Sequence, residues 1–143
     1  MSSDRRQAAD RIHSASIHLL RRVREVDAEA MGISAARASA LSVLVFGGPR
    51  SLTALARAER VTSATMSRLV DAMEKEGLVR RERDRDDARA VRLEATAKGR
   101  RVLEHGRARR LDLLESLLAD ASPGEIAAVR TAATVVERAL ESA

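Results

Sequence analysis

The sequence predicts a mainly α-helical fold that contains one small β-hairpin. Ala, Leu, Arg and Glu dominate the chain, and only two prolines interrupt it, which favours helix. Apolar residues recur at spacings of three and four over most of the chain, as they do on one face of a helix. Between residues 78 and 95 the helical spacing of apolar residues is replaced by an alternation of apolar and polar residues, which is typical of short strands. Apolar residues make up 45% of the 143 residues, enough for a packed core.

The first two helices are separated by a glycine. A long helix is expected over residues 4–30, because its apolar residues follow one another at spacings of three and four: Ile12, Ala15, Leu19, Val23, Val26 and Ala30. Gly32 ends this helix, and Ser34 can cap a second helix that runs to Phe46. The sequence Gly47-Gly48-Pro49 then predicts a break.

Two shorter helices follow, with a tight turn between them. Ser51 can cap a helix from residue 52 to about residue 59, and Thr62 or Ser63 can cap a helix that ends at Gly77. The second of these helices has an apolar stripe with helical spacing: Met66, Leu69, Val70 and Met73.

A charged hairpin and two more helices complete the chain. Residues 78–83 and 90–95 predict two strands joined by a charged turn. Thr96 can cap a fifth helix to about residue 119, and Ser122 to Glu125 has the spacing of a capping box. The last helix has an apolar seam over two heptads: Ile126, Val129, Ala133, Val136 and Leu140. Two helices, a short turn and a two-stranded wing are the order of a winged helix-turn-helix, flanked here by further helices on the N- and C-terminal sides.

Composition excludes several classes of function. Phe46 is the only aromatic residue, which argues against binding by aromatic stacking. The chain has no Cys, so it has no disulfide, no thiolate metal site and no Cys nucleophile. Lys and Arg number 26 against 21 Asp and Glu, and the resulting charge of +5 is compatible with an acidic polymer as partner.

The compartment expected from the sequence is the cytoplasm. No stretch approaches the roughly 18 unbroken apolar residues that a membrane span needs. The charged N-terminal segment is not followed by the apolar region of a secretory signal. We therefore expect no membrane partner.

The helix over residues 63–76 is the candidate for the helix that binds double-stranded DNA. A helical wheel puts four residues opposite its apolar stripe, with Ser67 beside them: Ala64, Arg68, Asp71 and Lys75. Arg68 can pair with guanine, and the Ala64 methyl can contact thymine. Ser63 and Thr65 lie where hydroxyls and free N–H groups can hold phosphate. The alternative is an ordinary amphipathic helix whose polar face meets only water.

The hairpin is the candidate wing. Between residues 80 and 92 it has six arginines against four carboxylates, a net charge of +2. Arg85 and Arg89 in its turn can enter a minor groove, and Asp87 can orient Arg89. The alternative is a solvated hairpin whose charges pair with one another.

These segments together resemble the MarR family of transcriptional regulators. The resemblance lies in residues 51–56 (SLTALA), 61–62 (VT), 67–71 (SRLVD), 73–80 (MEKEGLVR) and 84–89 (DRDDAR). It implies a DNA-binding domain over residues 34–96 and dimerisation helices over residues 1–33 and 97–143. The candidate DNA-contacting residues are Ser51, Ser63, Ala64, Thr65, Ser67, Arg68, Arg85, Asp87 and Arg89.

The resemblance also implies a homodimer that binds a pseudo-palindrome in double-stranded DNA. The apolar stripe of the first helix and the seam of the last are what such an interface needs. Its candidate residues are Ile12, Leu19, Val23, Val129, Val136 and Leu140. The alternative is that both surfaces are buried within one chain.

The family further implies a small-molecule effector, often aromatic or anionic, that releases the DNA. Phe46 is expected in the core, although together with nearby arginines it could line an effector pocket. His13 and His18 are five residues apart, which does not suit one metal ion, so neither a metal nor a cofactor is expected.

The sequence is compatible with four functions. The first is a sequence-specific dimeric repressor. The others are a winged-helix protein–protein interaction module, a non-specific architectural DNA-binding protein and an enzyme. The enzyme is disfavoured because Ser14 and Ser16, close to His13, lie on the same helix without a third orienting group, so no catalytic residue is assigned.

Overall fold

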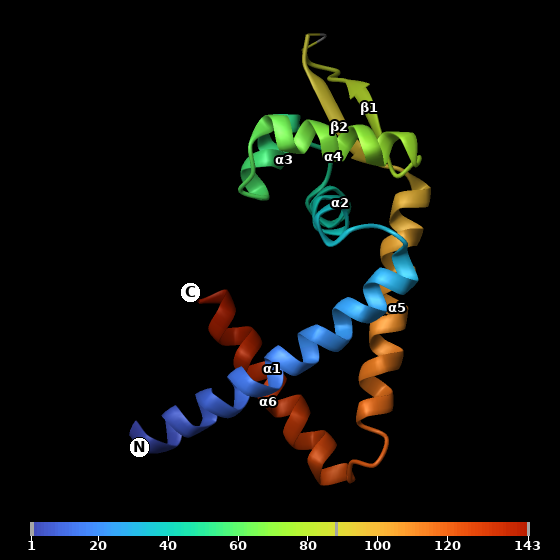
Figure 1. Ribbon diagram of the computed structural model, residues 1–143. Helices are drawn as coiled ribbons and strands as arrows, with labels where there is room; N and C mark the ends of the chain where they lie inside the picture. The colour runs from blue at the N-terminus through green and yellow to red at the C-terminus, as the bar shows by residue number, and fades with distance from the viewer. Residues whose placement is uncertain (1, 88, 143) are drawn as a thin grey trace. The chain divides into compact units, whose positions relative to one another are not determined.

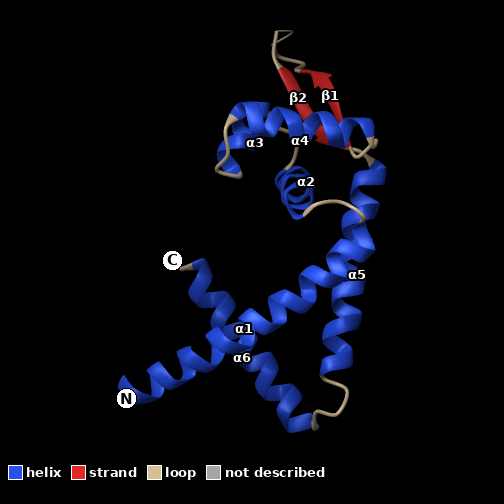
Figure 2. Ribbon diagram, in the orientation of Figure 1, coloured by secondary structure: helices blue, strands red, loops and turns tan. Residues whose placement is uncertain are grey.

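The computed structural model describes residues 2–87 and 89–142, so residue 88 in the predicted turn of the hairpin lies outside it (Figure 1). The described residues form six helices and one two-stranded sheet, which confirms the predicted fold class (Figure 2). The elements in order are α1 (Ser2–Met31), α2 (Ala35–Gly47), α3 (Leu52–Ala58), α4 (Ser63–Lys75), β1 (Val79–Arg83), β2 (Val91–Ala95), α5 (Ala97–Leu117) and α6 (Pro123–Glu141). The chain divides into two compact units, one up to Arg110 and one from Leu111 onward.

Side-chain caps fix the starts of α2 to α6, with Thr96 at α5 as predicted. Ser34, Ser51 and Ser122 accept the backbone N–H three residues ahead, as expected. Thr62, rather than Ser63, caps α4 and accepts the N–H of Thr65 at 3.1 Å. These caps satisfy N–H groups that have no partner within the helix, and they define where α3 and α4 begin.

The core lies in the winged part of the first unit. Helices α2, α3 and α4 bury apolar side chains against the hairpin and the start of α5. Its fully buried large side chains are Leu41, Leu44, Leu55, Met66, Met73, Leu78, Leu93, Val70 and Val79. Three of the four residues in the predicted α4 stripe are buried, and Leu69 packs against the cluster from its edge. This core holds α3 and α4 as a helix-turn-helix.

The wing is an antiparallel pair with one extra bridge. Val79 pairs with Ala95 and Arg83 pairs with Val91, so the two strands lie within the predicted ranges 78–83 and 90–95. Arg50 also exchanges backbone hydrogen bonds with Leu93, at 3.1 and 2.8 Å, which adds an isolated β-bridge beside the two-stranded sheet. The sequence did not predict this bridge, which ties the linker before α3 to the wing.

The first turn of α5 packs closely against the junction of α4 and β1. Thr96 Oγ1 donates to the Gly77 carbonyl at 2.6 Å and accepts the Gly99 N–H at 3.1 Å. A Cβ at Gly99 would lie 2.3 Å from the Leu78 carbonyl oxygen, so this approach requires glycine. Gly77, which follows the C-cap Glu76 of α4, has φ 75°, the left-handed conformation that glycine adopts at helix ends.

Helices α1 and α6 leave most of their apolar side chains exposed. No described residue of α6 is buried, and α1 exposes Ile12, Ile17, Leu19 and Leu20 by 39% or more. Phe46 is 81% exposed, so the expectation that it belongs to the core was wrong: the last turn of α2 points it outward. Within the described residues no single helix has the length and apolar character to cross a membrane; α1 and α2 meet that condition only jointly, across an 80° bend.

Candidate nucleic-acid interface

Helix α4 presents the predicted polar face to solvent. Arg68, Asp71, Lys75 and Ala64 are exposed, and Ser67 is half-buried at the edge of the buried stripe. Arg68 has no ion pair with any described residue, so its guanidinium is available to an outside partner. The structure therefore gives α4 one face that packs in the core and one face that is exposed to solvent.

The N-terminal turn of α4 is rich in exposed hydroxyls. Ser63, Ala64 and Thr65 are all exposed. Thr62 Oγ1 donates to Thr65 Oγ1 at 3.0 Å, so the Thr65 hydroxyl is oriented by the cap. Ser51 is exposed at the start of α3, where its side chain accepts the Ala54 N–H at 3.1 Å. Both helix starts can offer polar groups to an anion.

The base of the wing is held by ion pairs. Arg80 bonds Glu94, its partner in the strand register, at 2.9 Å and also pairs with Glu82 at 3.1 Å. The hydrogen bond from the Arg80 guanidinium lowers the pKa of Glu94 below its ordinary value, and the pKa of Arg80 is raised in return. These charges neutralise one another.

A second ion-pair cluster joins the wing to α4. Arg81 contacts Asp71 at 2.7 Å and Glu74 at 2.9 Å. Its hydrogen bond to Asp71 raises the pKa of Arg81. Asp71, predicted on the free face of α4, is therefore engaged within the protein.

The tip of the wing has arginines without carboxylate partners. Arg83, Arg85 and Arg89 form no ion pair with any residue from 2–87 or 89–142. Asp87 Oδ1 accepts the backbone N–H of Arg89 at 3.0 Å, and Asp84 Oδ1 accepts that of Asp86 at 2.9 Å. The predicted link between Asp87 and Arg89 thus runs through the backbone of Arg89, and the Arg89 side chain has no ion pair with a described residue.

The predicted dimer residues belong to two different units. In the first unit, Ile12 and Leu19 are exposed and Val23 is half-buried. In the second unit, Val129, Val136 and Leu140 are exposed. Each set forms an apolar face along its own helix.

A cavity of about 620 Å³ lies in the first unit between α1, α2 and the first half of α5. Phe46 and Arg24 line it, in line with the alternative that Phe46 and nearby arginines border a pocket, but the sequence did not indicate the other walls, which come from separated segments. Its apolar lining includes Leu20, Val23, Met31, Ile33, Val45 and Phe46. Its charged lining is Arg24, Asp27, Arg100, Glu104, Arg107 and Arg110. Asp27 and Arg110 pair at 2.7 Å, which links α1 to α5.

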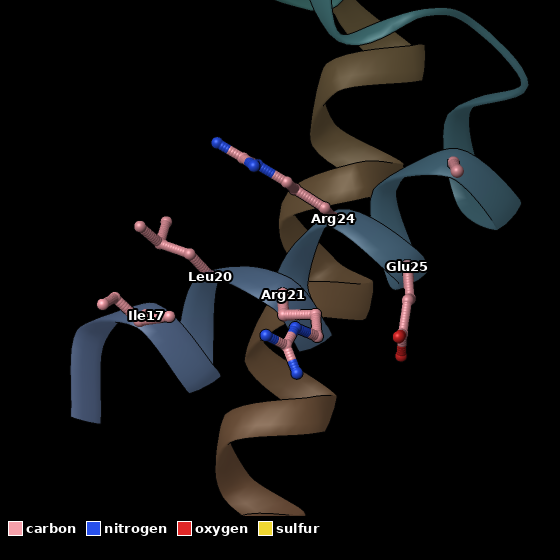
Figure 3. A pocket seen from close by; sticks show the side chains of 6 residues that line it. Ile17, Leu20, Arg21, Arg24 and Glu25 are labelled. Atoms are coloured by element: carbon pink, nitrogen blue, oxygen red, sulfur yellow. The ribbon is translucent and has the colours of Figure 1, made fainter. Parts of the chain in front are cut away.

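A second hollow lies along α1 alone, where Ile17, Leu20, Arg21, Arg24, Glu25 and Ala28 line it (Figure 3). One helix does not enclose a space by itself, so this hollow is an open helix face. In the described part of the chain, no group of three or more His, Cys, Asp or Glu side chains is arranged to hold a metal ion.

A helix-turn-helix with a basic wing, preceded and followed by long helices, is the architecture of a winged-helix transcriptional regulator. Residues 28–91 match the family model described as the MarR family. Residues 28–91 are therefore similar to a MarR-family domain, in agreement with the resemblance of the sequence motifs. No curated protein sequence matches the chain.

Solved structures share this fold over nearly the whole chain. A MarR family protein from Bacillus stearothermophilus has 24% identity and a TM-score of 0.81, with 99% of this chain and 98% of that chain covered. A MepR variant from S. aureus, bound to an oligodeoxyribonucleotide, has 18% identity and a TM-score of 0.74, with 93% and 97% covered. The transcriptional regulator BldR from Sulfolobus solfataricus has 28% identity and a TM-score of 0.59, with 94% and 96% covered.

Proposed function

We propose that this chain is a homodimeric, sequence-specific regulator that binds a pseudo-palindromic operator in double-stranded DNA. In this proposal it represses transcription in the cytoplasm and releases the operator when a small molecule binds. Residues 34–96 are the DNA-binding domain, and residues 1–33 and 97–143 are the dimerisation helices. It needs no catalytic residue and no cofactor.

The observation that supports the proposal most is that some arginines of the winged domain are paired with carboxylates and others are not. We call this the division of charges. Arg80 and Arg81 at the wing base are neutralised by carboxylates. Arg68 on α4 and Arg85 and Arg89 at the wing tip have no ion pair among residues 2–87 and 89–142. A helix face with a free arginine suits the major groove, and a basic wing tip suits the adjacent minor groove. An interaction module for proteins would instead favour an exposed apolar face on α4, and that face is polar.

Homodimer formation is supported by the terminal helices. A helix of 19 residues without a single described buried residue has little tertiary packing to stabilise it within one chain. Val129, Val136 and Leu140 are therefore proposed to pack against a second copy, together with Ile12, Leu19 and Val23 of α1. Two copies related by a two-fold axis would present two α4 helices to a pseudo-palindrome.

Effector binding is supported by the 620 Å³ cavity, which is in the size range of small-molecule sites. A ligand between α1, α2 and α5 would contact helices from both proposed domains. A compound that binds there should raise the unfolding temperature of the protein and weaken its affinity for DNA.

The test is a binding titration of the full chain against duplex DNA that flanks its own gene, followed by footprinting. A dimer that makes on the order of 6–10 phosphate contacts should lose affinity steeply as salt rises. A protected pseudo-palindrome that withstands excess competitor DNA supports the proposal. Equal affinity for every duplex would favour an architectural DNA-binding protein, and the absence of binding would favour a protein partner. A hydrolase screen tests the enzyme alternative.

A further inference from the structure

We infer that Arg60, in the turn between α3 and α4, is a further DNA-positioning residue whose guanidinium contacts a backbone phosphate. The inference rests on the proposed function, because it concerns how a duplex-binding helix is held in register. It adds a contact point that lies outside both α4 and the wing.

The backbone conformation of Arg60 is unusual. Its φ is 55°, and it is the one non-glycine residue with positive φ among those the structure describes. Glycine adopts this conformation without steric cost, whereas a residue with a Cβ does not. The backbone N–H of Arg60 donates to the Arg57 carbonyl at 3.2 Å, a bond that glycine would make equally well. The turn itself therefore gives no reason for an arginine.

The side chain of Arg60 has no partner that would explain it either. It is exposed, and no carboxylate of residues 2–87 or 89–142 pairs with it, although Glu59 is its neighbour in sequence. Arg57, in the last turn of α3, is favoured there by the helix dipole, but Arg60 lies beyond that turn. By contrast, another arginine of this domain, Arg37, does have a carboxylate partner, which is Glu76. Arg60 thus combines an unfavourable backbone conformation with a guanidinium that has no carboxylate partner among the described residues. This combination points to a ligand outside the protein.

The place of Arg60 in the chain identifies that ligand. It lies two residues before Thr62, the N-cap of α4, so the two Cα atoms are at most about 7.6 Å apart. The major groove is roughly 12 Å wide, and a helix with its side chains is about 10–12 Å across. A helix that fills the groove leaves the segment before its first turn at the groove edge, where the phosphates lie. A long cationic side chain there can contact one of them.

The experiment uses the full chain, a duplex bearing the site that the wild type protects and a random-sequence duplex of the same length. Arg60→Gly and Arg60→Asn remove the charge and tolerate the left-handed conformation, while Arg60→Lys keeps the charge. Arg101→Gln, at an exposed position on α5, controls for the loss of one positive charge. Affinity is measured against salt for each protein, and the unfolding temperature is measured in parallel.

We expect Arg60→Gly and Arg60→Asn to weaken binding to both duplexes by the same factor. They should lower the slope of log affinity against log salt by about 0.9 per subunit. Arg60→Lys and Arg101→Gln should keep the wild-type slope, and Arg60→Gly should unfold at or above the wild-type temperature. If Arg60→Gly and Arg60→Asn keep the wild-type affinity and the wild-type salt slope, the inference about Arg60 is overturned and the proposed function is not affected. Failure of the wild type to bind either duplex would instead overturn the proposed function.

Discussion

Arg81 of β1 lies 2.7 Å from Asp71 of α4, so the wing and the proposed recognition helix are joined by an ion pair on the surface that would face DNA. Glu74 adds a second contact to the same guanidinium at 2.9 Å. The pair fixes one element relative to the other, and it removes one arginine from the set available to phosphate.

Replacing Arg81 tests this division of charges. Arg81→Ala should weaken duplex binding, because it leaves Asp71 and Glu74 uncompensated and loosens the wing. Its cost in folding stability should stay below about 1 kcal/mol, as for exposed ion pairs. The salt slope should stay unchanged, because the charge of Arg81 is already neutralised.

The matched control is Arg85→Ala, at a wing-tip position that has no ion pair within the described part of the chain. It should reduce the salt slope by roughly 0.9 per subunit. Equal slopes for Arg81→Ala and Arg85→Ala would contradict the division into neutralised and free arginines.

The wing tip gives a second prediction. Asp87 Oδ1 accepts the Arg89 backbone N–H, so Asp87→Ala should open the turn and cost roughly 1 kcal/mol in DNA affinity. Asp87→Asn keeps an acceptor oxygen and should preserve the turn. The effect of Asp87→Ala should be less than additive with that of Arg89→Ala. Amide exchange at Arg89 measures the turn directly, and unaltered exchange in Asp87→Ala would refute this role.

The apolar seam of α6 predicts the oligomeric state. Val129→Asp or Val136→Asp would bury an unpaired charge in the proposed interface and should destabilise the dimer by about 3–5 kcal/mol. Thr131→Asp introduces the same charge on the opposite side of the helix and should leave the dimer intact. Sedimentation at micromolar concentration measures the mass of each protein. A monomeric wild type would contradict the homodimer.

Acidification should release the pair at the wing base. Because the folded-state pKa of Glu94 lies below its ordinary value of 4.5, its stabilising effect is complete above pH 4.5 and is lost as the pH falls through the folded-state pKa. The difference in unfolding free energy between wild type and Glu94→Gln should therefore be present at pH 6 and vanish in acid. A difference that is independent of pH would show that Glu94 does not act through its charge.

Local signals explain why much of the fold could be predicted. The stripe of Met66, Val70 and Met73 and the caps at Ser34 and Ser51 depend on residues within a few positions of one another. They gave the helix-turn-helix and the free face of α4 before any tertiary information.

Long-range pairings explain what could not be predicted. The bridge between Arg50 and Leu93 involves a single residue on one side, which has no period to detect. The partner of Arg81 depends on how the hairpin packs on α4, and composition alone did not distinguish free arginines from paired ones. Phe46 has the hydrophobicity of a core residue, but the last turn of α2 points it outward.

The central claim is that α4 reads the sequence of a DNA duplex through Arg68. The most direct measurement is the selection of bound sites from a pool of random-sequence duplexes by wild type and by Arg68→Ala in parallel. Wild type should enrich a pseudo-palindrome, and Arg68→Ala should lose preference at one position in each half-site at a cost of about 1–3 kcal/mol. Recovery of the full wild-type motif by Arg68→Ala would contradict the claim.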